Sequence, residues 1–356
     1  MARIDAILSL VKEQGASDLH MSAGSPPIVR INGEMMSVPY ERLTPEISEL
    51  LLFEIMDPQI RARYDADKDV DFSYEIPGVV RVRCNIYEQS RGVAGAFRIL
   101  PNSVPTFEQL GLPDSVTRLA ELQRGLVIVT GPPGTGKSST LAALVNHINR
   151  TQKKHILTLE DPIEYRHENQ QSLVTQREIG RNTPSFVQGL HGALREDPDV
   201  IMVGEMRDLE TVSLAITASE TGHLVLGTLH TSNASRTLDR LLDVFPVDQQ
   251  DQIRVMVSES LRGVISQQLV PRIDGKGRVL ALEILTNTPA VANVIREAKT
   301  FMLPGIIQTG RKQGMRLMDD SLTQLFDQGL ISAEEACSRA EQKQAMRQHV
   351  GENPKS

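Results

Sequence analysis

The 356 residues carry a net charge of −7, and their hydrophobic fraction of 40% is ordinary for a globular protein. The sequence pI of about 5.7 argues against a protein that charge draws to nucleic acid. The absence of tryptophan and an aromatic content of 4% argue against a groove that stacks bases. Two cysteines, Cys84 and Cys337, exclude a disulfide framework and a thiolate zinc site. No apolar run reaches the roughly 18 residues of a membrane helix, so membrane contact is expected only through partners.

Residues 1–100 are predicted to form a small α+β domain. Apolar residues recur at helical spacing from Ile4 to Val11, and Gly15 ends that helix. Two strands with turns follow, and then two short helices over 45–56 and 58–66. Apolar and polar residues alternate over 69–100, with breaks at two turns, which predicts three antiparallel strands.

The pattern of apolar and polar residues changes after a proline-rich stretch. Residues 101–113 are expected to be a linker. From residue 114 on, short apolar runs alternate with helical patterns, which is typical of a mostly parallel sheet covered on both faces. The sequence therefore predicts an α/β domain over 114–356, with a frayed polar tail beyond about residue 345.

The strongest motif is GPPGTGKS at residues 131–138, which matches G-x-x-x-x-G-K-[ST] between an apolar strand and an apolar-periodic helix. Glycines let backbone N–H groups wrap phosphates, and the helix N-terminus adds its positive end. Lys137 is expected on the β and γ phosphates of ATP, and the Ser138 hydroxyl on Mg²⁺. An accidental glycine-rich turn is the alternative, which the matching flanks disfavour. The predicted nucleotide-binding loop consists of Gly131, Pro132, Pro133, Gly134, Thr135, Gly136, Lys137, Ser138 and Ser139.

Acidic residues follow two further apolar strands. Glu160 and Asp161 are expected just past the strand HILTL, with Glu164 close by, and Glu205 follows the strand in DVIMVGEMRD. Ligands of open α/β sheets bind beyond the carboxyl ends of the strands, so these acids should face the phosphate loop. A carboxylate there can orient the attacking water or hold magnesium through water. The alternative for each acid taken singly is a solvated loop residue.

Two histidines flank the apolar run LVLGTL. His223 and His230 should lie roughly 20 Å apart along this strand, so they cannot share a metal or a proton relay. His230, at the carboxyl end, is predicted to contact the γ-phosphate or the attacking water. His223, at the other end, is expected to make structural hydrogen bonds. Two ordinary surface histidines are the alternative.

Four arginines gather in the N-terminal region: Arg81, Arg83, Arg91 and Arg98. Arg81 and Arg83 share a strand face because side chains alternate. Arginine suits bidentate phosphate contacts, but an arginine-rich surface sheet is also commonly just solvated. The residues alone leave both interpretations open.

The motifs GPPGTGKSST, TLEDPIEY, REDPDVIMVGEMRDLET and TGHLVLGTLHT follow one another in this order. The set resembles the secretion ATPase superfamily, and most closely the twitching-motility retraction ATPases (PilT family) of type IV pili, over nearly the whole chain. The resemblance implies a PAS-like N-terminal domain, a RecA-like ATPase domain and a ring homohexamer that uses Mg-ATP. It also implies a cytoplasmic location at the inner-membrane base of the pilus, with a platform protein there as partner.

By this resemblance, residues 131–139 form the Walker A loop, and Glu205 is the Walker B catalytic base in a motif that includes Arg207. Glu160, Asp161 and Glu164 match the Asp box, and His223 and His230 match the His box. Arg83 and Arg98 resemble arginines that reach the nucleotide from the N-terminal domain.

One position departs from the family pattern: in AVANVIRE, residues 290–297, Ala292 stands where retraction motors often have arginine. An accessory retraction ATPase working with a paralogue is therefore an alternative. A pilus-assembly or secretion ATPase is the weaker alternative, because the pilus-assembly relatives are longer and carry a four-cysteine zinc motif.

Overall fold

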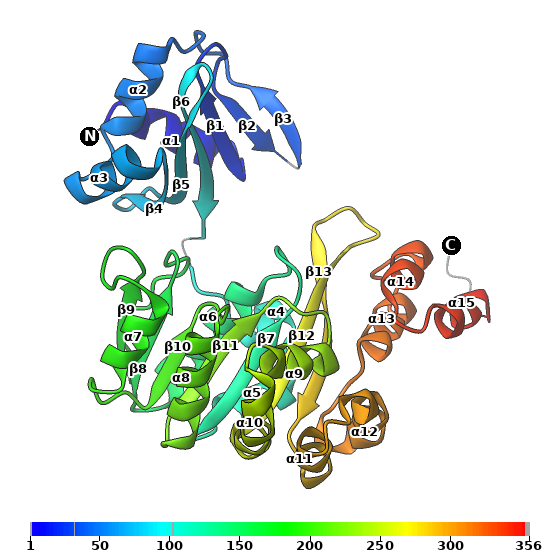
Figure 1. Cartoon of the computed structure of the whole chain (residues 1–356). Helices are drawn as coiled ribbons and strands as arrows, with labels where there is room; N and C mark the ends of the chain where they lie inside the picture. Colours follow the sequence, from blue (N-terminus) through cyan, green and yellow to red (C-terminus); the bar gives the residue numbers. More distant parts are fainter. Residues whose placement is uncertain (1, 32, 102, 353–356) are drawn as a thin grey trace. The chain divides into compact units, whose positions relative to one another are not determined.

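Two units, each with its own hydrophobic core, make up the chain in a computed structural model that describes residues 2–31, 33–101 and 103–352 (Figure 1). The first unit comprises the chain up to Ser103 together with the short segment Pro162–Arg166. The second unit comprises Val104–Asp161 and the chain from His167 onward. The segment Pro162–Arg166 thus belongs by its contacts to the first unit, although both of its neighbours in sequence belong to the second.

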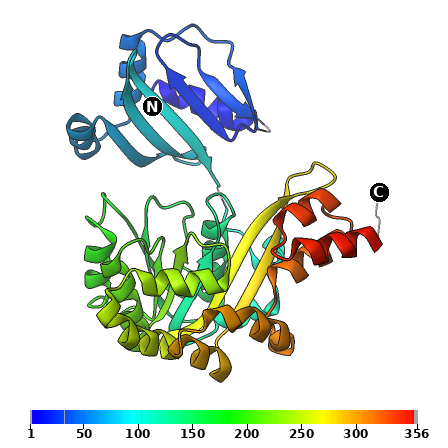
Figure 2. The ribbon, with the colours of Figure 1, turned by 45° about the vertical axis from the view of Figure 1, so that its right-hand side comes forward.

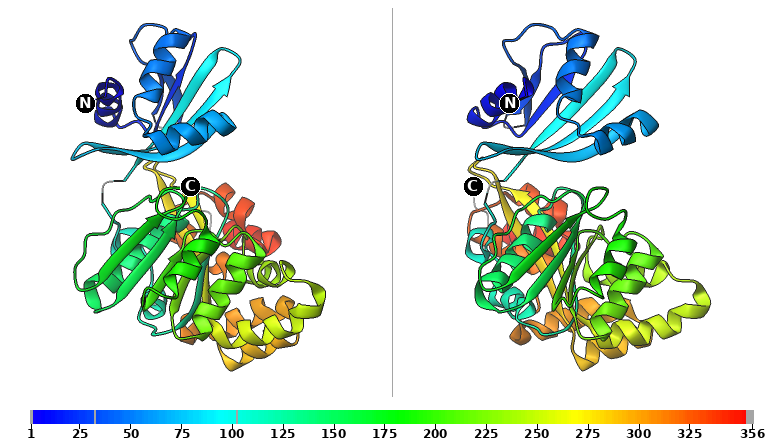
Figure 3. Two further views of the ribbon diagram at one scale, coloured as in Figure 1. Left: turned by 60° about the vertical axis from the view of Figure 1, so that its left-hand side comes forward. Right: turned by 90° about the vertical axis from the view of Figure 1, so that its left-hand side faces the viewer.

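A six-stranded antiparallel sheet forms the first unit, in the order β3-β2-β1-β6-β5-β4. Its elements, in chain order, are α1 (Ile4–Glu13), β1 (Asp18–Ser22), β2 (Ile28–Ile31), β3 (Glu34–Ser37), α2 (Pro45–Phe53), α3 (Pro58–Asp67), β4 (Asp69–Ile76), β5 (Val80–Gln89) and β6 (Gly92–Leu100). Helices α1 and α2 pack beside the sheet (Figure 3). Gly95 lets α2 approach β6 closely, since a Cβ there would lie 2.8 Å from Leu52. This is the small α+β unit that the sequence predicts.

The second unit is built on a seven-stranded sheet in the order β13-β12-β7-β11-β10-β8-β9. Its strands are β7 (Gly125–Thr130), β8 (His155–Glu160), β9 (Leu173–Glu178), β10 (Val200–Val203), β11 (Leu224–Leu229), β12 (Leu261–Pro271) and β13 (Arg278–Thr286). Neighbours from β12 to β9 run parallel, and β13 pairs antiparallel with β12. The carboxyl ends of β7, β8, β10 and β11 therefore share one edge, which confirms the predicted α/β class.

Helices cover both faces of this sheet. They are α4 (Phe107–Leu110), α5 (Asp114–Ala120), α6 (Lys137–Thr151), α7 (Phe186–Ala193), α8 (Leu209–Glu220), α9 (Ala234–Asp243), α10 (Val247–Ser260), α11 (Pro289–Arg296), α12 (Leu303–Thr309), α13 (Met318–Asp327), α14 (Ala333–Arg339) and α15 (Lys343–Glu352), with 3₁₀ turns at Thr300–Met302 and Gly310–Gln313. Alternate strand residues explain the two layers: Leu126 and Ile128 of β7 belong to one core cluster, and Val127 and Val129 to another. Helices α13–α15 pack on the hairpin of β12 and β13 through a separate core (Figure 2).

The structure differs from the sequence-based expectation at two connecting segments. The expected linker, 101–113, contains α4, and Phe107 is buried in the core that α6 shares with the sheet, so the connection between the units is shorter. The tail expected to be frayed is helical through Glu352. Met346 packs in the core of α13 and α14, and the His349 Nε2 to Asp327 Oδ1 distance is 2.9 Å. Residues 353–356 lie outside the described residues. Within the described part of the chain, no helix combines the length and apolar character needed to cross a membrane.

Candidate active site

The phosphate loop joins β7 to α6 at the carboxyl edge of the second unit's sheet. A Cβ on Gly131 would lie 2.4 Å from the backbone oxygen of Gln267, so only glycine fits there. Gly136, with a φ of 86°, precedes α6, and no side chain caps that helix. Helix α6 therefore begins without a side-chain cap, and the N-terminus of a helix is where an anion such as phosphate binds.

The remaining loop residues differ in burial and in their contacts. Lys137 is buried, and its Nζ donates to the backbone oxygens of Gly131 at 2.8 Å and Pro132 at 3.1 Å. Gln267 of β12 holds the backbone of the loop, because its Nε2 donates to the Thr135 backbone oxygen at 2.6 Å. Pro132, Pro133, Gly134 and Ser138 are exposed, Thr135 is buried, and Ser139 is half-buried. The sequence did not single out Gln267, which lies more than a hundred residues further along the chain.

A chain of contacts links the loop lysine to the acid after β10. Lys137 Nζ lies 3.1 Å from His230 Nδ1, and His230 Nε2 lies 2.7 Å from Glu205 Oε1. Because lysine only donates, Nδ1 must accept and Nε2 must carry the proton that faces Glu205. His230 is therefore held as one neutral tautomer between a cation and a carboxylate. Arg207 Nε lies 2.5 Å from the same Glu205 oxygen.

These neighbours determine the charge state of Glu205. Burial raises the pKa of the Glu205 carboxyl, but the hydrogen bonds from Arg207 and His230 and the charge of Arg207 lower it by more, so the net pKa is below its ordinary value. Glu205 is thus ionised at neutral pH. Thr228 of β11 donates to the Gly204 oxygen, and Met206 N donates to the Thr228 oxygen at 3.1 Å, which fix the turn that carries Glu205.

Glu160 is the last residue of β8 rather than the first residue beyond it, and its side chain is buried. Its Oε1 accepts hydrogen bonds from Thr158 Oγ1 at 2.6 Å and from Gln176 Nε2 at 2.9 Å. Asp161 follows at the surface of the same edge, whereas Glu164 lies in the segment that belongs to the first unit. The structure therefore places Glu160 and Asp161 at the second unit's carboxyl edge and assigns Glu164 to the first unit.

His223 lies at the other end of β11. Its backbone oxygen accepts from Gly125 N, the first residue of β7, and its Nδ1 lies 2.9 Å from the Ala218 oxygen near the end of α8. The two histidines thus have different surroundings, one at each edge of the sheet, as the sequence indicates.

The four arginines of the first unit have distinct environments. Arg81 is buried, and its guanidinium donates to the backbone oxygens of Ile163 and Glu164, so it holds the segment Pro162–Arg166. Arg83 and Arg98 are opposite each other on β5 and β6. Each pairs with an acid of its own unit, Asp71 and Asp18 respectively, and Arg91 is exposed. Contact of Arg83, Arg98 or Arg91 with a nucleotide stays a prediction.

Two further sets of hydrogen bonds at the carboxyl edge of the sheet were not predicted from the sequence. Thr130 Oγ1 donates to the Thr231 oxygen at 2.7 Å, and the hydroxyls of Thr231 and Thr237 lie 2.7 Å apart, so hydroxyls tie the segment after His230 to β7 and α9. Glu283 of β13 is buried and accepts from Ala234 N, the first residue of α9, at 2.8 Å. The only sequence signal for these residues is a polar side chain within an otherwise apolar strand.

The residues present fit a magnesium–nucleotide complex. Among the described residues there is no cluster of three or more histidines, cysteines or acids that could hold a metal unaided. Mg²⁺ generally keeps several waters and binds through one or two protein oxygens plus substrate phosphates. The exposed Ser138 hydroxyl at the start of α6 suits that mode of binding.

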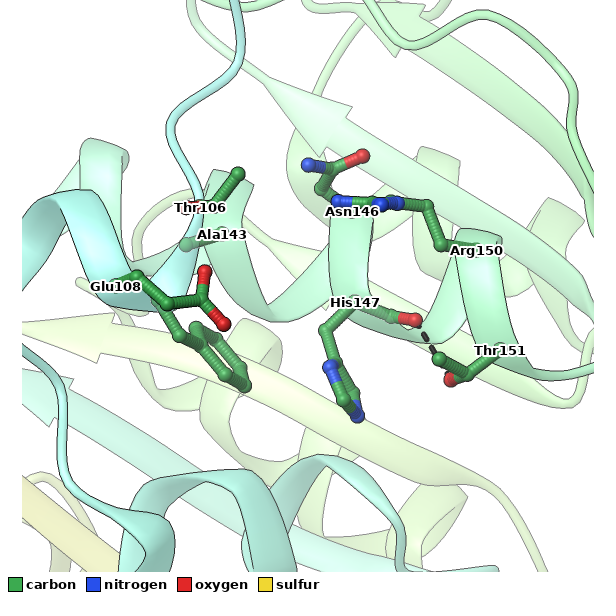
Figure 4. Close-up of a pocket in the computed structure, with 8 residues that line it drawn as sticks. Thr106, Glu108, Ala143, Asn146, His147, Arg150 and Thr151 are labelled. Atoms are coloured by element: carbon green, nitrogen blue, oxygen red, sulfur yellow. Dashed lines mark hydrogen bonds between the residues drawn. The ribbon is translucent and has the colours of Figure 1, made fainter.

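A separate pocket of about 260 Å³ lies beside the C-terminal half of α6 (Figure 4). Its lining comes from α4 and from residues 143–151 of α6, with Phe107 stacked on His147 at a centroid distance of 4.9 Å. None of the residues of the Lys137–His230–Glu205 chain lines it, so this pocket is not part of the candidate active site.

Comparisons with known proteins identify the family of this chain. The family model described as "Type II/IV secretion system protein" matches residues 1–350. The chain is 49% identical over 337 residues to the type IV pilus retraction ATPase PilT of Pseudomonas aeruginosa, covering 95% of this chain and 98% of that protein. It is 47% identical over 344 residues to a twitching motility protein of Neisseria gonorrhoeae, covering 96% and 92%. The crystal structure of the pilus retraction motor PilT with bound ADP matches with a TM-score of 0.89 at 45% identity, covering 97% and 98%.

Proposed function

Because this chain belongs to the type II/IV secretion system protein family, we propose that it is an ATP-hydrolysing motor that powers retraction of type IV pili. The observation that carries the enzymatic part is the contact chain from Lys137 through His230 to Glu205, which joins a phosphate-loop cation to a carboxylate. The near full-length identity with a retraction ATPase supports the biological role.

Binding begins at the phosphate loop. The N–H groups at the start of α6 and the Lys137 ammonium would bind the phosphates of ATP, and the Ser138 hydroxyl would hold Mg²⁺, which would neutralise charge on the phosphates. Glu160, held by Thr158 and Gln176, orients the water shell of the metal or the nucleophile. To reach the phosphates, the Lys137 ammonium must leave the loop oxygens of Gly131 and Pro132.

Hydrolysis then uses Glu205. Its ionised carboxylate orients a water and accepts the water's proton as the oxygen attacks the γ-phosphorus and the bond to the β–γ bridging oxygen breaks. His230 shares one contact chain with both Lys137 and Glu205, so it transmits the position of the lysine to the base. The presence of the γ-phosphate therefore affects Glu205 through Lys137 and His230. His223 instead stabilises the fold at the opposite edge of the sheet.

The motor works as a homohexamer in the cytoplasm, at the inner-membrane base of the pilus, and meets the membrane only through partners such as a platform protein. A paralogous pilus ATPase is a further partner in this proposal, which Ala292 in the family's arginine position supports. The acidic charge balance supports a machine that does not act on nucleic acid.

Deletion of the gene, followed by imaging of surface pili, tests the proposal. We expect excess unretracted pili and loss of twitching, with recovery on expression of the wild-type chain. Glu205→Gln should bind ATP, turn it over roughly 10²-fold more slowly and fail to restore retraction, because it lacks the basic carboxylate. Normal retraction in the deletion strain would refute the role of a retraction motor. Full recovery with Glu205→Gln would refute the assignment of the base.

A further inference from the structure

Three side chains lie on one face of the sheet where β8 pairs with β9. Thr158 and Glu160 alternate along β8 onto the same face, and Gln176 of β9 is opposite Thr158 in the parallel register. Thr158 is fully buried, Glu160 is nearly so, and Gln176 is half-buried. The proposed catalytic carboxylate therefore has two polar neighbours that the register itself brings to it.

Both neighbours donate to the same oxygen. Glu160 Oε1 accepts from Thr158 Oγ1 at 2.6 Å and from Gln176 Nε2 at 2.9 Å. A glutamate side chain has three rotatable bonds, and two converging donors fix both its direction and the plane of its carboxylate. A carboxylate that must orient water gains from this restraint, because misplacement by about 1 Å can cost on the order of 10²-fold in rate.

The amide of Gln176 is itself held in one orientation. Its Oε1 accepts from the backbone N–H of His167 at 2.9 Å, on the segment that returns to β9. Rotating the amide by half a turn would place its oxygen against Glu160 and its NH₂ group against a backbone donor, so the donor toward Glu160 is fixed. Gln176 thus bridges the segment after the Asp box and the carboxylate of Glu160.

From these contacts we infer that Gln176 is a positioning residue for Glu160, acting on catalysis only through that carboxylate. The inference rests on the proposed role of Glu160 in ATP hydrolysis. It predicts that removing the Gln176 donor lowers kcat while the affinity for ADP and the KM for ATP stay near wild type, because the hydrogen bonds of Gln176 to Glu160 and to His167 N hold the carboxylate and the segment before β9.

The test measures steady-state ATP turnover by the full-length chain carrying Gln176→Met or Gln176→Leu. Gln176→Met keeps the unbranched length of the side chain and removes the donor to Glu160 without placing a second carboxylate there, so it should fold even if the leucine variant does not. We expect kcat to fall about 10-fold or more for either variant. Thr175→Val is the matched control, since Thr175 bonds His155 on the opposite face of the same strand, and its kcat should stay at wild type.

A double-mutant cycle separates positioning from a general structural effect. In a Glu160→Ala background, Gln176→Met should have no further effect on kcat, because the oxygen that accepts from Gln176 is gone. An equal loss of kcat with and without Glu160 would overturn the inference while leaving the role of Glu160 intact. Wild-type kcat in Glu160→Ala alone would instead overturn the role of Glu160 in the proposed function, and the positioning role with it.

Discussion

At the residue scale, β11 separates two histidines whose partners predict different consequences of mutation. His230 contacts Lys137 and Glu205, whereas His223 bonds the end of α8 and the start of β7. We expect His230→Ala to fold normally, bind ATP and ADP with similar affinity, and hydrolyse ATP slowly. The reason is that its loss disconnects the phosphate-loop lysine from the base.

His223→Ala should behave in the opposite way. Losing the contact to the Ala218 oxygen should lower the melting temperature or the yield of assembled rings, with ATP and ADP affinities that still differ as in wild type. Binding of both nucleotides to each variant, measured beside its melting temperature, checks the pair. Loss of discrimination in His223→Ala but not in His230→Ala would reverse the assignment, and equal loss in both would remove the division of labour.

At the element scale, strand β13 places an acid at the start of two helices. Glu283 is buried and receives hydrogen bonds from Ala234 N, which begins α9, and from Met318 N, which begins α13. Burial raises the pKa of the Glu283 carboxyl to about 7, and the nearby charges of Glu341 and Asp319 also raise it, against the two backbone donors. The acid therefore lies between the segment after His230 and the C-terminal helices.

This raised pKa gives a stability prediction with a definite sign. Between the ordinary pKa of 4.5 and about 7, the folded state keeps a proton that the unfolded chain releases, so the free energy of unfolding falls as pH rises through this window. The fall should amount to about 3 kcal/mol at most. Glu283→Gln removes the titrating group and should flatten this part of the profile.

Denaturant unfolding from pH 5 to pH 8 provides the measurement. The exposed Glu334 on α14 offers a matched control, and Glu334→Gln should keep the wild-type slope. An unchanged slope in Glu283→Gln would mean that the buried carboxyl does not govern this pH window.

Periodicity and motif spacing predicted the elements that carry the phosphate loop, Glu160, Glu205 and His230, because β7, β8, β10 and β11 are short, mostly apolar runs with these residues at or just beyond their carboxyl ends. The same reasoning missed the residues that hold these groups. Gln176, Gln267 and Glu283 come from β9, β12 and β13, and their partners lie 16, 132 and 49 residues away along the chain. Only strand order and register bring them to the site, and neither follows from local pattern.

The contact partners of the arginines in the first unit could not be predicted from the sequence either. The sequence places Arg81 and Arg83 on one face of a strand, but whether an arginine meets an acid, a backbone oxygen or a phosphate depends on neighbours several strands away. Arg81 holds the oxygens of Ile163 and Glu164, a segment more than eighty residues later. Composition alone could not separate that structural role from nucleotide binding.

At the scale of the whole molecule, the proposed ring makes a prediction about mixtures. If the subunits of a homohexamer act together, one inactive subunit should impair its neighbours, and Glu205→Gln chains should suppress wild-type activity beyond simple dilution. Independent subunits would leave about half of the activity in an equal mixture, whereas a ring stopped by one inactive member would leave only about 2%.

The measurement is ATP turnover after wild-type and Glu205→Gln chains are co-assembled at varied ratios. Lys137→Ala serves as the comparison, since it should bind nucleotide weakly because its phosphate-binding cation is missing. A strictly linear decline with the Glu205→Gln fraction, in samples shown to contain mixed rings, would contradict cooperative action and favour subunits that each hydrolyse ATP alone.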